Sequence, residues 1–189
     1  MKPELTSREI LGTGKFLSLE LLHYRDAKGA ERTWEAVRRQ NTPNAVIIIA
    51  RTVPEDCILL VRQFRPALGR YSVAFPAGLI DPGETAATAA LRELKEETGY
   101  SGKLLHVGPY TSSSAGLSAE LLASANVQVD LNAPENKLPQ TDFQDGEDIQ
   151  TFVVPMSDLQ AFLQKHLDDG DGLDSRLAFW ALALGNVLG

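Results

Sequence analysis

The sequence predicts an α/β fold, and two observations lead to that prediction. Runs with apolar side chains at alternate positions, many of them β-branched, recur along the chain, and such runs are typical of β-strands. The segment 85–98 instead spaces its apolar residues as an α-helix does, and two further segments near the C-terminus share that spacing. Strands and helices mixed in this way along one chain place it in the α/β class.

The expected strands are separated by turn residues. They cover 16–23, 33–39, 45–50, 57–63, 71–75, 103–107, 121–129 and 149–154. Turn sequences such as Asp26-Ala27-Lys28-Gly29 between the early strands predict meandering antiparallel pairs. We expect the first two strands to form a small N-terminal antiparallel sheet, and the polar stretch 132–148 to be a mobile loop.

The helix at 85–98 has recognisable ends. Thr85 or Asp81 is expected to cap its N-terminus. Gly99 suits the left-handed conformation that commonly follows a helix. These signals predict that the helix begins after a loop and stops at a glycine.

Two helices are expected to close the chain. Ser157 is expected to cap the first, and the second is expected to extend to Leu188. The acidic, glycine-containing run 168–172 between them is interpreted as a solvated linker, because it lacks the closing Glu of a calcium-binding loop. We expect all three histidines to be structural or exposed: His23, His106 and His166.

Composition and charge exclude several classes of protein. With 189 residues, against roughly 150 per domain, the chain is expected to form one compact domain with room for a small appended part. Its 43% apolar and 23% charged residues exclude a disordered or coiled-coil chain. The net charge of −7 excludes a general binder of nucleic-acid backbones. A polyanionic substrate would therefore need a local basic patch or a metal ion.

The expected cellular location follows from apolar stretches and cysteine content. No apolar stretch reaches the ~18 residues of a membrane span, and the first residues lack the core of a signal peptide. The single cysteine, Cys57, lies in an apolar run, which predicts a buried thiol and a reducing compartment. We therefore expect a soluble cytoplasmic protein without a membrane partner, found also in the nucleus in the case of a eukaryote.

One face of the 85–98 helix is expected to carry three carboxylates. Glu93, Glu96 and Glu97 are spaced by three and four residues, so they share one stripe of a helix. A second, mostly apolar stripe consists of Ala87, Ala90, Leu91, Leu94 and Thr98. Because like charges within one turn repel, Arg92 can offset part of the repulsion through Glu96, and a hard divalent cation such as Mg²⁺ the rest. A solvated acidic face is the alternative interpretation.

The segment that contains this helix resembles the Nudix box. That motif is Gly, five residues, Glu, seven residues, Arg-Glu, an aliphatic residue, any residue, Glu-Glu, any residue, Gly and an apolar residue. The chain matches it at Gly78, Glu84, Arg92, Glu93, Leu94, Glu96, Glu97 and Gly99, with Tyr100 at the apolar place. The resemblance implies a Nudix α/β/α sandwich around a mixed sheet. It also implies hydrolysis of a nucleoside diphosphate linked to another moiety, with Mg²⁺ or, as a substitute, Mn²⁺.

The resemblance also assigns roles within the box. Glu93 and Glu97 are implied as the principal metal ligands, with the Ala77 carbonyl as a further ligand. Glu96 is implied to serve an additional metal ion, and Arg92 to assist catalysis by holding loop and helix in place. The residues implied to be structural within the motif are Gly78, Glu84 and Gly99.

A catalytic base is implied in the polar stretch 144–148. Enzymes of the family that this chain resembles place there a glutamate that moves in to assist the attacking water, and Glu147 is the candidate. Asp145 and Asp148 are rivals for the role, and an exposed acid without a catalytic role is the alternative. A base must come within about 3 Å of the water that it activates.

Segments outside the box resemble the ADP-ribose pyrophosphatase branch of the family, which includes eukaryotic ADP-sugar enzymes. The matching segments are 14–16, 32–35, 63–66 and 75–81. The resemblance implies a homodimer in which N-terminal strands, 1–43, are exchanged, followed by a Nudix hydrolase domain at 44–189. It implies a small nucleotide-sugar substrate and no nucleic-acid partner.

The branch resemblance also implies substrate contacts. Phe16 and Trp34 are implied to sandwich the adenine, and the alternative is that both rings belong to the core of a sheet. Arg39 and Arg65 are implied to bind the diphosphate, with surface salt bridges as the alternative. Further implied contacts are Glu35, Gly116 and Leu117. Two positions depart from the branch: Ala115 stands where proline is usual, and Phe16 where tryptophan is frequent.

The implied function is metal-dependent hydrolysis of ADP-ribose, or of a close ADP-sugar, to AMP and a sugar phosphate. One alternative is a hydrolase of another substrate, such as GDP-mannose, UDP-glucose or an oxidised nucleotide. The other is a catalytically silent Nudix domain that binds ADP-ribose as a sensor. Three intact box glutamates favour hydrolysis, since a protein that only binds has no need of a complete metal cluster.

Overall fold

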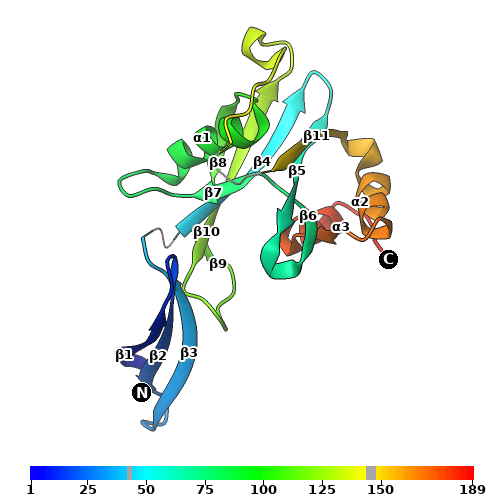
Figure 1. Cartoon of the computed structure of the whole chain (residues 1–189). Coiled ribbons are helices and arrows are strands. Elements are labelled where there is room, and N and C mark those ends of the chain that lie inside the picture. Colours follow the sequence, from blue (N-terminus) through cyan, green and yellow to red (C-terminus); the bar gives the residue numbers. More distant parts are fainter. Residues whose placement is uncertain (42–43, 144–147) are drawn as a thin grey trace.

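A computed structural model describes residues 1–41, 44–143 and 148–189 of the chain. Within these ranges it contains two sheets and three α-helices, and helices cover both faces of the larger sheet (Figure 1). The predicted α/β fold, a sandwich around a mixed sheet with a small N-terminal antiparallel sheet, is confirmed. No helix in the described ranges is long and apolar enough to cross a membrane.

The larger sheet mixes parallel and antiparallel strands. Its strands are β4 (Asn44–Val53), β5 (Cys57–Arg65), β6 (Arg70–Ala74), β7 (Ala77–Leu79), β8 (Lys103–Val107), β9 (Thr111–Ser112), β10 (Leu121–Asp130), β11 (Ile149–Pro155) and β12 (Gly172–Leu173). β4 pairs in parallel with β10 along its whole length, but meets β5 only at Arg51 and Ile58. The expected antiparallel pairing holds for β4 with β5 and for β5 with β6. The parallel partner of β4 was not expected, because local turn residues carry no information about a partner so distant in sequence.

Strand alternation divides the core into two clusters, one on each face of the larger sheet. α1 (Ala86–Thr98) covers one face, while α2 (Leu159–Asp168) and α3 (Ser175–Ala183) cover the other (Figure 1). On β5, Leu59 packs in the cluster that contains α1, and its neighbours Ile58 and Leu60 pack in the cluster that contains α2 and α3. Each fully buried side chain of this kind contributes roughly 1.5–3 kcal/mol of burial free energy.

The ends of α1 are those that its sequence predicts. Thr85 is the N-cap: its side chain accepts from Thr88 N at 3.2 Å, and Thr85 N donates to Thr88 Oγ1 at 3.0 Å. The alternative cap, Asp81, lies in the preceding loop instead. Gly99 follows the helix with a φ of 75°, the left-handed conformation that favours glycine.

The two C-terminal helices differ from expectation at their ends. Ser157 lies in a 3₁₀ turn, Met156–Asp158, and α2 begins at Leu159. The N-cap position is therefore taken by Asp158 rather than by Ser157. α3 ends at Ala183, well before the expected Leu188, because Gly185 with a φ of 89° turns the chain out of the helical path.

The smaller sheet is built from the N-terminal residues and extends away from the rest of the molecule (Figure 1). Its strands are β1 (Glu4–Thr13), β2 (Leu17–Arg25) and β3 (Glu31–Arg39), all antiparallel. The Asp26 turn joins β2 and β3 as predicted, but β1 was not expected. Two register shifts break its alternation and all its residues are exposed, so it lacks the period-two pattern that identifies a half-buried strand.

Two segments expected to be solvated or mobile are anchored. In the described part of 132–148, the buried Asn136 accepts from Ser101 N at 2.7 Å and donates to Asp130 O at 2.9 Å. In 168–172, Asp171 is buried. It accepts from Arg62 Nε at 2.6 Å and contacts His166 Nδ1 at 2.7 Å. This Arg62 hydrogen bond holds the pKa of Asp171 below its ordinary value.

Candidate active site

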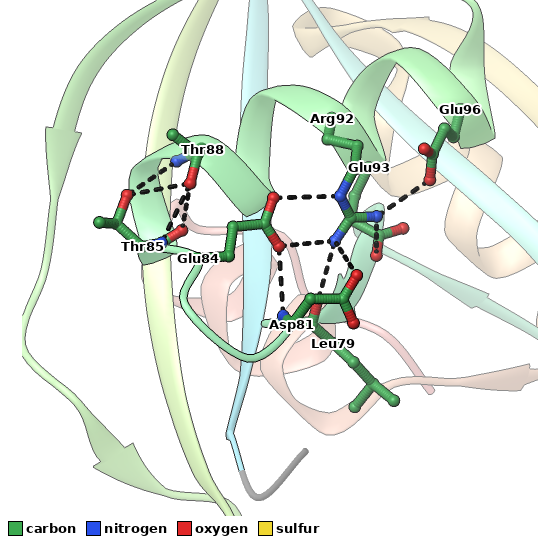
Figure 2. Close-up of polar contacts among 8 residues, drawn as sticks. All are labelled: Leu79, Asp81, Glu84, Thr85, Thr88, Arg92, Glu93 and Glu96. Atoms are coloured by element: carbon green, nitrogen blue, oxygen red, sulfur yellow. Dashed lines mark hydrogen bonds and ion pairs between the residues drawn. The ribbon is translucent and has the colours of Figure 1, made fainter. Parts of the chain in front are cut away.

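Arg92 joins α1 to the loop that precedes it (Figure 2). Its guanidinium grips Glu84 through Nε to Oε1 at 3.1 Å and through Nη2 to Oε2 at 2.9 Å. Nη2 also donates to the carbonyl of Leu79 at 3.1 Å. The other end of the loop is tied to the same carboxylate, since Asp81 N donates to Glu84 Oε2 at 3.2 Å. A single arginine therefore fixes the shape of the loop at 79–84.

The same guanidinium supplies positive charge to the acidic stripe of α1. Nη1 of Arg92 donates to Glu93 Oε1 at 2.8 Å and to Glu96 Oε2 at 3.0 Å, the second being the pair expected from their spacing. The hydrogen bonds from Arg92 hold the pKa of Glu84 below its ordinary value. The carboxylates of Glu84 and Glu93 in turn raise the pKa of Arg92, which stays charged.

Glu93 and Glu97 bind α1 closely to strand β7. A Cβ atom built on Gly78 would lie 1.8 Å from Cδ of Glu93, so only glycine permits this approach. Glu97 Oε2 accepts from Ala77 N at 3.0 Å, and the residue is buried. The alternative interpretation of a solvated acidic face is therefore wrong for Glu97. The inward face also differs, because Ala86 and Ala89 are buried, whereas Ala87 and Leu91 are not.

A cleft of about 240 Å³ opens beside these residues. It is lined by Gln63, Arg65, Ala77, Gly78, Leu79, Asp81, Arg92, Glu93 and Glu97. The structure thus brings Arg65 of β5 together with the predicted metal ligands, although they are distant in sequence. Gln63 and Asp81 were not predicted from the sequence to be site residues. The position of Gln63, two residues before Arg65 on one strand, signals a shared face.

The donor atoms in this cleft suit a hard divalent cation. Carboxylate oxygens and a backbone carbonyl are the ligands that Mg²⁺ prefers, and the cleft offers Glu93, Glu97 and Ala77. No group of three acidic or histidine side chains converges as an ion site in the ranges that the structure describes. Arg92 donates to oxygens of Glu93 and Glu96, and Ala77 N donates to an oxygen of Glu97.

The residues predicted to bind the adenine lie away from this cleft, around β3. Trp34 Nε1 donates to Gly116 O at 3.1 Å, and Val37 N donates to Leu117 O at 2.8 Å. Side chains in this region line a second cleft, of about 260 Å³, which shares no lining residue with the first: Leu17, Val37, Arg39, Ser113, Ser114, Leu117, Ser118 and Glu120. Arg39 is paired with Glu120, its Nε lying 3.2 Å from Oε2. Within one chain, Arg39 and Arg65 therefore line different clefts.

Both predicted aromatic residues are exposed. Phe16 is 64% exposed, with Lys15 Nζ 5.0 Å from the centre of its ring, and Trp34 is 50% exposed. The alternative that the two rings form the core of a sheet is therefore wrong. Glu35 is likewise exposed on β3, next to Trp34. These rings are free of a protein core and accessible to a ligand.

The predicted base lies outside the described residues. Glu147 and its rival Asp145 both fall in 144–147, whereas the second rival, Asp148, is exposed directly before β11. Ala115, which stands at the usual place of a proline, lies in the exposed turn that carries Gly116.

Comparison with known proteins identifies the family. The model of the NUDIX domain matches residues 41–174, a range that contains the whole box and both sides of the first cleft. The chain belongs to the Nudix family. The mouse ADP-sugar pyrophosphatase is 35% identical, with 95% of this chain and 86% of that protein covered. The ADP-ribose pyrophosphatase of Saccharomyces cerevisiae is 39% identical, with 86% of this chain and 74% of that protein covered.

A solved structure shares the fold of this Nudix protein over nearly its full length. The crystal structure of an ADP compounds hydrolase superposes with a TM-score of 0.69 at 24% identity, and covers 99% of this chain and 98% of its own. The prediction of a Nudix hydrolase is confirmed by the family match and by the two relatives. The N-terminal sheet, outside the matched domain range, is included in this structural agreement.

Proposed function

We propose that this Nudix hydrolase cleaves the diphosphate of ADP-ribose, or of a related ADP-sugar, to give AMP and a sugar phosphate. The observation that carries the proposal is the first cleft, in which Arg65 faces the box residues Glu93 and Glu97. A guanidinium suits the oxygens of a diphosphate, and carboxylates suit a metal ion that binds the same oxygens. The names of the mouse and yeast relatives support an ADP-linked substrate.

We propose Mg²⁺ as the cofactor, with Mn²⁺ as a substitute. Glu93, Glu97 and the Ala77 carbonyl would hold one ion, and their place in the lining of the cleft supports this set. Glu96, which contacts Arg92, would hold a further ion. A bound divalent cation supplies charge neutralisation for phosphate oxygens and lowers the pKa of water. Because Arg92 already contacts Glu84, Glu93 and Glu96, it would hold these carboxylates beside the cleft while the loop keeps its shape.

The residues of the chain divide the remaining work. Water adds to one phosphorus as the bond from that phosphorus to the bridging oxygen breaks, and the leaving phosphate keeps the electron pair. We assign to Glu147 the removal of the proton from the water, and to Arg65 the binding of the diphosphate. Arg65 is exposed, and a charge-assisted contact of both its donor groups with the diphosphate would also orient the bond to be cleaved.

We further propose that 1–43 form a separate part, exchanged in a homodimer, and 44–189 the hydrolase domain. The N-terminal sheet exposes five apolar side chains that a second copy would cover: Leu5, Ile10, Leu11, Leu17 and Leu19. In such a dimer Phe16 and Trp34 would enclose the adenine. The net charge of −7 argues against a nucleic-acid partner, and the single, buried Cys57 suits the reducing cytoplasm.

The test is turnover of a substrate panel in ¹⁸O-labelled water, with Mg²⁺ and with EDTA. The panel contains ADP-ribose, ADP-glucose, GDP-mannose, UDP-glucose and 8-oxo-dGDP, and products are resolved by mass. AMP and ribose 5-phosphate formed fastest from ADP-ribose, only with metal, would support the proposal, and the label identifies the attacked phosphorus. Faster turnover of another nucleotide would overturn the substrate. Binding of ADP-ribose without any turnover would indicate the sensor.

Glu97→Gln separates chemistry from folding in the same assay. The amide keeps an oxygen that can accept from Ala77 N but loses the charge, so kcat should fall by about 1,000-fold or more while the melting temperature changes little. Glu55→Gln is the matched control, because Glu55 is exposed and lies outside both clefts. Unchanged kcat in Glu97→Gln would contradict its assignment as a metal ligand.

A further inference from the structure

One loop of the hydrolase domain forms hydrogen bonds with β3, the strand that carries Trp34 and Arg39. The loop 113–120 runs beside β3, where Gly116 O accepts from Trp34, Leu117 O accepts from Val37, and the Glu120 carboxylate accepts from Arg39. β3 ends at Arg39, the side of the N-terminal sheet that faces the larger sheet (Figure 1). Arg39 is therefore the member of this set that lies nearest to the hydrolase domain along the chain.

The backbone at Glu120 is well held. Its N–H donates to Ser118 Oγ at 2.9 Å, and its carbonyl accepts from Ser113 N at 3.2 Å, directly before β10 begins at Leu121. Its side chain is 23% exposed, against 38% for that of Arg39. The backbone of Glu120 is thus fixed, whereas Arg39 has a longer and more exposed side chain. Glu120 is therefore the partner that sets the geometry of the pair.

We propose that Glu120 is the positioning residue for Arg39, and that it sets the affinity for the diphosphate substrate. The inference rests on the proposed function and on the role that the family resemblance implies for Arg39, binding of that diphosphate. The contact from Glu120 uses Nε of Arg39. The guanidinium has donors on two edges, and the edge formed by its two Nη groups can bind a pair of phosphate oxygens while Nε is held by Glu120. Glu120 therefore directs the arginine while leaving its fork available.

Two effects of Glu120 oppose each other. Its negative charge repels a diphosphate, but the pair lies at the surface, where water and salt screen that repulsion. Its hydrogen bond removes rotational freedom from a long side chain before substrate arrives, and that ordering would otherwise oppose binding. Because water weakens the repulsion at this partly exposed site, we expect the ordering of Arg39 to dominate, so that removal of the carboxylate weakens substrate binding rather than strengthens it.

A double-mutant cycle with Arg39→Lys tests the inference in steady-state assays with ADP-ribose. Glu120→Gln should raise KM by about fivefold, with kcat within about twofold. Arg39→Lys should raise KM by about tenfold, because one ammonium cannot serve both partners. The double variant should also be raised about tenfold, well short of the roughly 50-fold that independent effects would give. Glu120→Asp, which keeps the charge, should recover part of the loss.

The control is another ion pair of the same sheet, Glu31 with Arg25 at 3.0 Å, which lies far from the loop along β3. Glu31→Gln should leave KM unchanged, and all variants should keep the wild-type melting temperature to within a few degrees. An unchanged or lower KM in Glu120→Gln, multiplicative effects in the double variant, or an equal rise in Glu31→Gln would each overturn the inference.

The wild-type assay separates this inference from the proposed function. If the wild type turns over another member of the panel faster, the proposed substrate fails, and the cycle is measured with that nucleotide, where the same pattern would still support Glu120. If the wild type turns over ADP-ribose but the cycle shows no coupling, the inference alone fails. A wild type that neither binds nor turns over any member overturns both.

Discussion

The box helix and the N-terminal sheet show two ways of building part of a binding site. α1 is joined to its loop and to β7 by contacts within one short stretch of sequence, and one of its carboxylates, Glu97, is buried. β1 of the N-terminal sheet is exposed throughout, and β3 depends on the loop 113–120 for its polar contacts with the hydrolase domain. The proposed metal ligands therefore lie in a unit joined by local contacts, whereas the proposed adenine-binding rings lie on a sheet that the loop 113–120 joins to the rest of the chain.

The largest difference between the two regions is expected from added methyl groups. In Gly78→Ala, the new Cβ would overlap Glu93, which must move away from the cleft. Since a displacement of about 1 Å in a catalytic group can cost about 100-fold in rate, kcat should fall by about that factor. Gly12→Ala in β1 is the matched control, because nothing lies within 4 Å of its added Cβ. Equal activity of both variants in the ADP-ribose assay would contradict the comparison.

A smaller effect is expected from Trp34, and it should fall on KM alone. Trp34→Ala removes a stacking surface worth ~1–3 kcal/mol, so KM should rise by about tenfold or more while kcat is kept. Trp34→Phe keeps a ring but loses the hydrogen bond to Gly116 O, and it separates stacking from docking of the loop. If Phe restores KM, stacking dominates; a KM as high as that of Ala would assign the effect to the loop.

The smallest effect is expected on the free energy of unfolding, and it should depend on pH. Because Arg92 lowers the pKa of Glu84 below its ordinary value of 4.5, this pair stabilises the fold above that pH, and the contribution disappears as pH falls through the lower, folded-state pKa. Glu84→Gln should therefore reduce the free energy of unfolding at pH 7 by about 1 kcal/mol. Urea denaturation at pH 7 and at about pH 3 measures it.

The difference between variant and wild type should narrow toward acid pH, since protonated Glu84 resembles glutamine. A constant difference between pH 7 and about pH 3 would show that the Glu84 carboxylate is not stabilised by Arg92. Arg51 and Asp56 form an exposed pair away from the cleft, and Asp56→Asn serves as the comparison with little expected effect at either pH.

The sequence predicted the local features of the molecule much better than the distant ones. Thr85, Gly99 and the spacing of the box glutamates fixed α1 and its ends, because caps and helical spacing act within a few residues. The parallel pairing of β4 with β10 was missed, as was the burial of Asp171 by Arg62, because each depends on residues that only the fold brings together.

The candidate site divides along the same line. Its box residues were found from their spacing, and Arg65 from the family resemblance. Asp81 has no spacing signal of its own, and the only signal for Gln63 is the strand face that it shares with Arg65. The spacing placed Glu97 correctly on the helix but left its burial open, since helical periodicity tells which residues share a face but not what covers that face. The partner of Arg39, Glu120, also could not be found from sequence, because it lies in another sheet-connecting loop.

The segment that carries the candidate base is tied down at both ends. A Cβ on Gly99 would lie 2.6 Å from Gln140 N, and Asp142 N donates to Glu96 O at 2.9 Å. Residues 140–142 therefore pack closely against the C-terminal end of α1. It joins the sheet again at Ile149, opposite Gln63. A stretch of sequence between two such fixed points can be replaced as one unit. Evolution, or a designed library, can thus vary the base and its neighbours without rebuilding the core that supports them.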